Sequence, residues 1–331
     1  RQRQMCIRDR VGLGGEGSAQ RTIAGGEGVS IHSSTLRPSP QFAGKAPALL
    51  SRMKGMNTQS GVFAFGATEH LFLTFDLTAG ADVQEALQIL AQAGNPATTD
   101  MVNVVVGVRP SLWAEVADAA DVPSDVHDYT ETKGEGVTAM PAEQHDFWIW
   151  ISAAGMDACW DWAKQTIIAF GSNAELTSEH RGWGYHGNQD LTGFVDGTEN
   201  PGRLEAPQHV AIPEGKPGAG ASILLFQPYE HTKFNWYETS IEEQEKAIGR
   251  TKLENIEFDD DVKPLSAHVA RTNIDTDEVE VKVWRRNVAY GDMRRHGTLF
   301  VGFTNEQWKL EDMLDRMAGV DGVHDSIMNF M

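Results

Sequence analysis

The chain has 331 residues, a length that predicts two domains. Hydrophobic residues make up 40% of it and charged residues 23%, an ordinary globular mixture. The 47 acidic residues outnumber the 28 lysines and arginines, which gives a net charge of −19. A field of this sign repels nucleic acid and anionic membrane surfaces, so we expect neither as a partner.

The two cysteines, Cys6 and Cys159, do not predict a disulfide framework. Cys159 stands in an apolar stretch and is expected to be a small buried hydrophobic residue. The longest apolar run, residues 147–156, is too short to span a bilayer. The first residues carry charge without the apolar core of a signal peptide. We therefore expect a cytoplasmic location.

Residues 1–56 differ from the rest of the chain, because they are rich in Gly, Ser, Pro and Arg and have no apolar period. We set them aside as a disordered or non-native segment. From there on, strand-like and helix-like patterns alternate. The predicted strands are 70–77, 102–108, 146–152, 221–230, 278–286 and 297–304. The predicted helices are 81–94, 110–119, 155–171, 240–249 and 305–319.

Local signals mark some helix ends. Ser240 and Glu243 have the spacing of a capping box, Gly249 ends the same helix, and Asn305 is a plausible N-cap of the last one. Both halves of the chain interleave strands with helices, which predicts an α+β fold with helices packed on antiparallel-rich sheets. Gly, His and Asn cluster near 172–200, so we expect domains at 57–190 and 191–331.

The stretch "LTGFVDGTENPG" (191–202) places Asp196 at the end of an apolar run. A turn aspartate is the ordinary interpretation, since "DGTENP" is dense in turn formers. A surface cation site using Asp196, Glu199 and Asn200 is a second interpretation, although their spacing fits no EF-hand loop.

His268 stands in "KPLSAHVARTNI", just after the acidic run "FDDDVKP", where a short helical or extended segment begins. A structural histidine is the ordinary interpretation. There is no second His or Cys at a zinc-like spacing. One histidine suits a haem better, because the porphyrin supplies four of the iron ligands.

The segment "VWRRNVAYGD" (283–292) ends an apolar strand with two arginines and then Asn287. A charged strand end that faces water is the ordinary interpretation. In an alternating strand the two arginines point to opposite sides, so only one of them can enter a pocket.

Taken together, the three segments resemble the dye-decolorizing peroxidase family and, within it, the bacterial type B class. Gly193, Asp196 and Gly197 match the family signature G-x-x-D-G. Residues 242–270 resemble the segment that leads to the proximal histidine, and "VWRRNVAYG" resembles the segment that carries the distal arginine. The resemblance covers about residues 58–330.

The resemblance implies two ferredoxin-like domains with one haem b per chain, held in the second domain. His268 would be the axial ligand of the iron, and Glu280 the acid that accepts its Nδ1–H. Asp196 and Arg285 would lie over the open side of the iron and assist cleavage of the O–O bond, with Asn287 orienting peroxide. Arg285 is preferred to Arg286 because it stands two residues before Asn287, as in the family pattern.

Further residues are assigned to the cofactor site with alternatives beside them. Arg271 would pair with a haem propionate, or else is a surface arginine. Leu299 and Phe300 would line the pocket, or else are ordinary core. The remaining cofactor-binding positions are Gly193, Gly197 and Thr198, and the two glycines would let the backbone pass close to the porphyrin.

The resemblance therefore predicts a haem peroxidase that reduces hydrogen peroxide while oxidising dye-like or phenolic donors. The alternative is a haem-handling protein with incidental peroxidase activity, and a third hypothesis is a haem-free α+β binding protein. We expect a homo-oligomer. The chain stops where the family continues into a further strand, and it lacks the extension that directs some relatives into encapsulin shells, so a cargo role is unsupported.

Overall fold

The computed structural model describes residues 58–331 except 135–138, 188, 232–233 and 277–278. Predictions made for residues 1–56, and for Cys6 among them, lie outside this part of the chain. The strands are β1 Glu69–Leu77, β2 Val102–Val108, β3 Thr132–Lys133, β4 Ala139–Met140, β5 Phe147–Ala153, β6 Ala174–Trp183, β7 Ile223–Glu230, β8 Ile274–Thr276, β9 Val279–Val281, β10 Trp284–Gly291 and β11 His296–Thr304.

The helices are α3 Val83–Ala93, α4 Pro110–Val116, α5 Met156–Phe170, α6 Ala206–Val210, α7 Asn235–Glu238, α8 Ile241–Ile248, α9 His268–Thr272 and α10 Trp308–Ala318. Short 3₁₀ turns lie at η2 Ser60–Phe63, η3 Ala119–Asp121 and η4 Ser326–Phe330. Among the described residues, no helix combines the length and the apolar composition needed to cross a bilayer.

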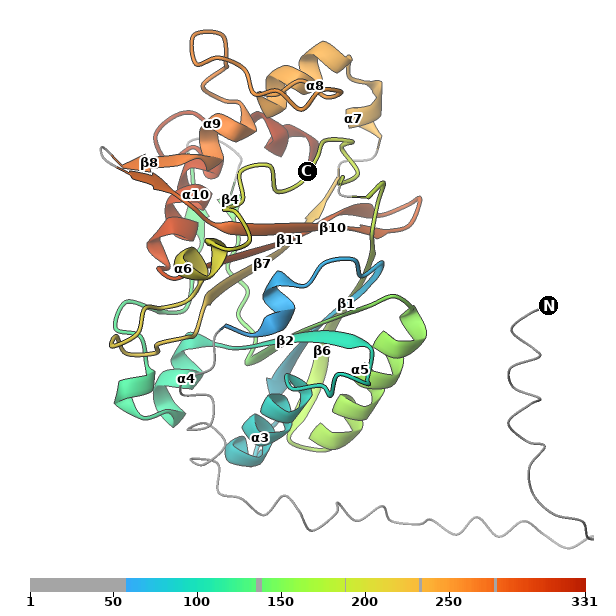
Figure 1. Cartoon of the computed structure of the whole chain (residues 1–331), viewed down its shortest axis with the longest axis vertical. Coiled ribbons are helices and arrows are strands. Elements are labelled where there is room, and N and C mark those ends of the chain that lie inside the picture. Colours follow the sequence, from blue (N-terminus) through green and yellow to red (C-terminus); the bar gives the residue numbers. More distant parts are fainter. Residues whose placement is uncertain (1–57, 135–138, 188, 232–233, 277–278) are drawn as a thin grey trace, which may run out of the picture. The chain divides into compact units, whose positions relative to one another are not determined.

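Seven strands form one antiparallel sheet in the order β2-β5-β1-β6-β10-β11-β7 (Figure 1). The first four strands lie before residue 184 and form the first half of the sheet, and the last three lie after residue 222 and form its second half. The halves are joined where β6 pairs with β10, over only two residue pairs, Ala289 with Trp183 and Tyr290 with Gly182. The fold is α+β, as the sequence predicts.

Alternation along the strands divides the core into layers. Leu71 and Ile149 face α3 and α5, while Phe72 and Trp150, one residue further along each strand, face the second half of the sheet. Buried residues of β10 and β11 meet this second group, which includes Trp284, Leu299 and Val301. The opposite face of β11 packs against α10 through a third cluster, which includes Phe300, Leu310 and Met313. The second half of the sheet therefore has one face toward the first half and one toward α10.

Most predicted elements are present, with three differences. The sequence does not predict the central strand β6, because its residues are mostly polar and exposed; it lies in the stretch near 172–200 where the domain boundary is expected. The strand predicted at 278–286 is two strands, β9 and β10. The last helix begins at Trp308 with Gln307 as its N-cap, so Asn305 is not the cap. The capping box of Ser240 with Glu243 and the stop at Gly249 are confirmed, and Cys159 is buried with a free thiol, as predicted.

Candidate active site

The site begins at Asp196, in the loop that follows β6. Its carboxylate Oδ1 accepts a hydrogen bond from Asn287 Nδ2 at 2.6 Å, and Oδ2 accepts one from the Asn287 backbone N–H at 3.0 Å. Burial raises the pKa of Asp196 to about 6, the Asn287 N–H opposes the rise, and the nearby charge of Asp190 adds to it. A carboxyl with this pKa can both accept and return a proton near neutral pH.

The two arginines of β10 point to different sides, as predicted. Residues two apart in a strand share a face, so Arg285 lies on the face of Asn287, which bonds Asp196. Antiparallel pairing places Asn287 opposite Phe300, and Phe300 packs against α10. Arg285 therefore faces the side of the sheet that carries α10 and the adjoining α9.

Arg286 turns to the opposite face, toward the first half of the sheet. Its Nη1 donates to the carbonyl of Ala64 at 2.7 Å, and its guanidinium lies 4.5 Å from the ring centroid of Phe65 and 5.7 Å from that of Trp150. It also borders a cavity of about 280 Å³ that Asp196, Phe65 and Trp284 help to line. Arg286 therefore approaches Asp196 from the face of β10 opposite to that of Arg285.

Gly193 and Gly197 both have left-handed backbone, with φ of 84° and 69°. A Cβ at Gly193 would lie 2.9 Å from Lys252 Cε, and one at Gly197 would lie 2.6 Å from Asn200 Nδ2. The left-handed backbone of the turn therefore favours glycine at both positions, whereas the end of the Lys252 side chain could move away from a Cβ at Gly193. This reason differs from the predicted close approach to a porphyrin.

His268 is the first residue of α9. Its Nδ1 lies 2.6 Å from Oδ2 of Asp325, a carboxylate that is fully buried. Its side chain is 32% exposed, and within the described ranges no hydrogen bond reaches Nε2. An imidazole oriented by a carboxylate on one nitrogen and open on the other is the usual state of a metal-binding histidine. The residues present thus fit a haem with a single protein ligand.

Electrostatics link this histidine to the loop of Asp196. Burial raises the pKa of Asp190 above its ordinary value. Two hydrogen bonds from Thr192 and the nearby charges of His268 and Lys252 act in the opposite direction. The charge of Asp190 in turn acts on Asp196. Asp190 therefore lies within electrostatic range of both His268 and Asp196.

Two assignments from the sequence change. The acid that pairs with His268 is Asp325, in place of Glu280, whose side chain lies outside the described part of the chain. The second concerns Arg271, which is buried and not at the surface. Its guanidinium donates to the carbonyl of Arg316 at 3.0 and 2.9 Å and to Asp321 at 2.6 Å. Its donors hold the end of α10, so we withdraw the propionate pairing.

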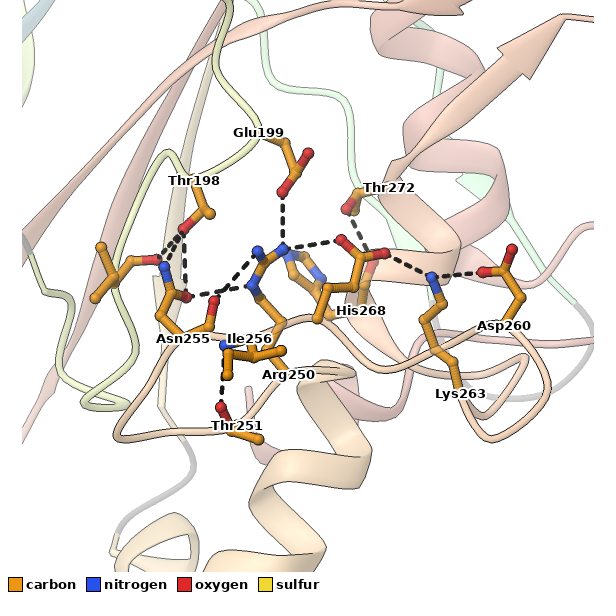
Figure 2. A network of polar contacts seen from close by, with 12 residues as sticks. Thr198, Glu199, Arg250, Thr251, Asn255, Ile256, Asp260, Lys263, His268 and Thr272 are labelled. Carbon is orange, nitrogen blue, oxygen red and sulfur yellow. Dashed lines mark hydrogen bonds and ion pairs between the residues drawn. The ribbon is translucent and has the colours of Figure 1, made fainter.

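Arg250 is a buried cation beside this site that the sequence analysis missed. Its Nη1 contacts Glu199 at 2.8 Å and Glu257 at 3.0 Å, and Glu257 also contacts Lys263 at 2.6 Å (Figure 2). The preceding Gly249 packs against Ala267, the residue before His268. Arg250 follows a helix-ending glycine, and that was the only local signal of its position.

The other residues that the sequence assigns to the cofactor site are Thr198, Leu299 and Phe300. Thr198 is exposed and bonds Asn255 and the carbonyl of Val195. Leu299 is fully buried between the two halves of the sheet, and Phe300 is buried against α10. Leu299 is therefore core, whereas Phe300 lies on the face that carries Arg285.

Comparisons with known proteins agree with this geometry. Residues 59–184 match the family described as Dyp-type peroxidase, N-terminal, and residues 187–331 match Dyp-type peroxidase, C-terminal. The chain belongs to the dye-decolorizing peroxidase family. The family supports the peroxidase over the haem-handling alternative.

Two dye-decolorizing peroxidases illustrate the similarity in sequence. The chain is 32% identical over 310 residues to that of Mycolicibacterium paratuberculosis, covering 91% of this chain and 82% of the relative. It is 35% identical over 238 residues to that of Mycobacterium tuberculosis, covering 70% of each. The solved structure of DyPB from Rhodococcus jostii RHA1 matches with a TM-score of 0.73 and 33% identity, over 81% of this chain and 90% of that one.

Proposed function

We propose that this dye-decolorizing peroxidase holds haem b through His268 and reduces hydrogen peroxide while oxidising a dye-like or phenolic donor. The observation that carries the proposal is the pair of His268 with the buried Asp325. Asp190 lies within electrostatic range of both His268 and Asp196, which supports placing them on the same cofactor. The Rhodococcus DyPB was solved in complex with haem as variants at an arginine and at an aspartate, which supports the cofactor. When bound, haem supplies the iron that passes electrons from donor to peroxide.

His268 and Asp325 act as one unit in this proposal. Asp325 accepts the Nδ1–H of the imidazole, which fixes the ring orientation and makes Nε2 a stronger electron donor. A more basic Nε2 favours the oxidised states of a bound metal. Asp325 is therefore our candidate for the role that the resemblance assigns to Glu280.

Asp196 moves the proton that peroxide cleavage requires. As a carboxylate it accepts a proton from one peroxide oxygen, and as an acid it returns that proton to the other oxygen, which leaves as water. Asn287 holds both carboxylate oxygens, so the group is oriented before peroxide arrives.

Arg285 stabilises the negative charge that develops on the leaving oxygen. A guanidinium remains charged at every working pH, and its fixed donors match an oxygen anion. Its position on the face of Asn287 supports this role, whereas Arg286 already bonds Ala64 and stacks on two rings. Arg250, near His268, already donates to Glu199, Glu257 and Asn255, so by the same reasoning as for Arg271 we assign it no haem carboxylate.

Other features of the protein remain predictions. They are the type B class, the domain boundary near residue 190, a cytoplasmic location and a homo-oligomeric state. Strands from both sides of this boundary belong to one sheet, because β6 pairs with β10.

The proposed roles are tested by the haem spectrum and by rapid mixing with peroxide. His268→Ala should lose haem, whereas Arg285→Ala and Asp196→Ala should keep the Soret band and react with peroxide about 10²-fold or more slowly. Arg181→Ala is the control, because that arginine is 63% exposed on β6. An Arg285→Ala protein that reacts at the wild-type rate would contradict the assignment of Arg285.

A further inference from the structure

The loop of Asp196 fills a gap in the hydrogen-bond ladder of the sheet. Strand β6 ends at Trp183, where it faces Ala289 of β10, but β10 begins five residues earlier, at Trp284. Alternate residues of a strand direct their backbone N–H and C=O groups to the same side. Those of Arg285 and Asn287 therefore point to the side that β6 has left. Backbone groups in this position need other partners.

Side chains from the loop supply these partners. Asp196 Oδ2 accepts the Asn287 N–H at 3.0 Å. Asn200 bonds Arg285 twice, since its Oδ1 accepts the Arg285 N–H at 2.8 Å and its Nδ2 donates to the Arg285 carbonyl at 2.8 Å. A primary amide carries a donor and an acceptor side by side, as the backbone of a neighbouring strand does. Asn200 thus replaces the strand residue that β6 does not provide.

The turn between the two side chains is built for this contact. Asn200 donates its backbone N–H to the carbonyl of Gly197 at 3.0 Å, which closes the turn. Gly197 has a left-handed φ, and a Cβ added there would lie 2.6 Å from Asn200 Nδ2. Only glycine therefore fits this position. The signature glycine after Asp196 therefore lets Asn200 reach β10.

We infer that Asn200 is a positioning residue that fixes Arg285 for the reaction with peroxide. This inference rests on the proposed role of Arg285. The backbone of Arg285 sets the direction in which its long side chain leaves the strand, so a small rotation of the peptide is amplified at the guanidinium. A misplacement of about 1 Å can cost about 10²-fold in rate. Asp196 is held by Asn287, not by Asn200, so its proton transfer stays intact when Asn200 is changed.

The test uses the haem-loaded protein and the variants Asn200→Ala, Asn200→Asp and Arg285→Leu, with the double variant Asn200→Ala/Arg285→Leu. We expect Asn200→Ala to keep the wild-type haem content and to react with peroxide about ten- to a hundred-fold more slowly. Asn200→Asp keeps the acceptor for the Arg285 N–H and loses the donor, so it should fall between Asn200→Ala and the wild type. The pH midpoint of the peroxide reaction should not move, because Asp196 keeps its partners.

Asn173→Ala is a matched control, because the Asn173 amide also makes two bonds, to the Asp82 N–H and to Glu85, far from β10. It should react at the wild-type rate. In the double-variant cycle, Asn200→Ala should add no further loss to Arg285→Leu, since its effect passes through the arginine.

Three results would overturn the inference, and they separate its failure from that of the proposed function. An equal loss from Asn200→Ala in both backgrounds means that Asn200 acts elsewhere. If Arg285→Leu is slow but Asn200→Asp, or a folded Asn200→Ala, reacts at the wild-type rate, the positioning role of Asn200 is excluded and the proposed role of Arg285 stands. A wild-type rate in Arg285→Leu removes the proposed role of the arginine and the inference with it.

Discussion

At the scale of single residues, Asp196 gives the reaction a pH dependence. Burial raises its pKa to about 6, so the carboxylate that accepts the proton of peroxide forms as the pH rises through that value. We expect the rate of reaction with peroxide to increase from pH 5 to pH 7. Asp196→Asn should be at least about tenfold slower and nearly flat over this range, as stopped-flow measurements can establish. A slope that persists in Asp196→Asn would assign the titration to another group.

Asp325 acts on the histidine and not on peroxide. In Asp325→Asn the buried negative charge is lost, so the imidazole of His268 becomes a weaker electron donor. We expect haem affinity to fall about 10- to 100-fold and the iron reduction potential to rise, as measured by haem transfer and spectroelectrochemistry. Asp321→Asn is the control, because Asp321 is 53% exposed and pairs with Arg271. An unchanged potential in Asp325→Asn would exclude this role of Asp325.

At the scale of elements, the sequence predicts what local periodicity encodes. The capping box of α8 and its glycine stop involve neighbours in the chain, and both are confirmed. Asp325 and His268 lie 57 residues apart and no local pattern connects them, so the resemblance led to Glu280 instead. The sequence does not predict strand β6, because its mostly polar side chains lack the alternating apolar pattern although the strand is central in the sheet. Contacts set by tertiary packing are the part that a single sequence leaves open.

The end of α8 provides a prediction at this scale. Gly249 has φ of 91°, and a Cβ there would lie 3.1 Å from the Cβ of Ala267, next to His268. Gly80 has φ of 84° with open space around it, so Gly80→Ala measures the cost of the backbone alone, about 1 kcal/mol. We expect Gly249→Ala to lower the free energy of unfolding further and to weaken haem retention. Equal effects of the two variants in urea unfolding would mean that the contact with Ala267 is unimportant.

At the scale of the whole molecule, the core between the two halves of the sheet joins them into one structure. Phe72 and Trp150 of the first half pack with Trp284 and Leu299 of the second. The Nε1–H of Trp150 donates to His70 Nδ1 at 3.1 Å inside this core. Charging His70 would therefore disturb the packing between the halves, and the stability of both depends on its neutral form.

This arrangement predicts acid sensitivity. Burial lowers the pKa of His70 to about 4, with Arg286 adding to the effect, and burial lowers that of His231 to about 4, with His296 adding to it. The unfolded chain binds these protons near pH 6.5, so stability is lost as the pH falls from 6.5 to 4, by on the order of 3 kcal/mol for each histidine. Because the pKa of Asp196 is raised to about 6, its protonation in the folded protein adds to the free energy of unfolding as the pH falls and offsets part of this loss.

Urea unfolding between pH 6.5 and 4.5 measures the effect. His231→Phe should flatten the dependence of the unfolding free energy on pH by about one proton, because the histidine that takes up that proton on unfolding is gone. If His231→Phe keeps the wild-type slope, the acid sensitivity arises outside the β7–β11 end of the sheet, where His231 and His296 lie.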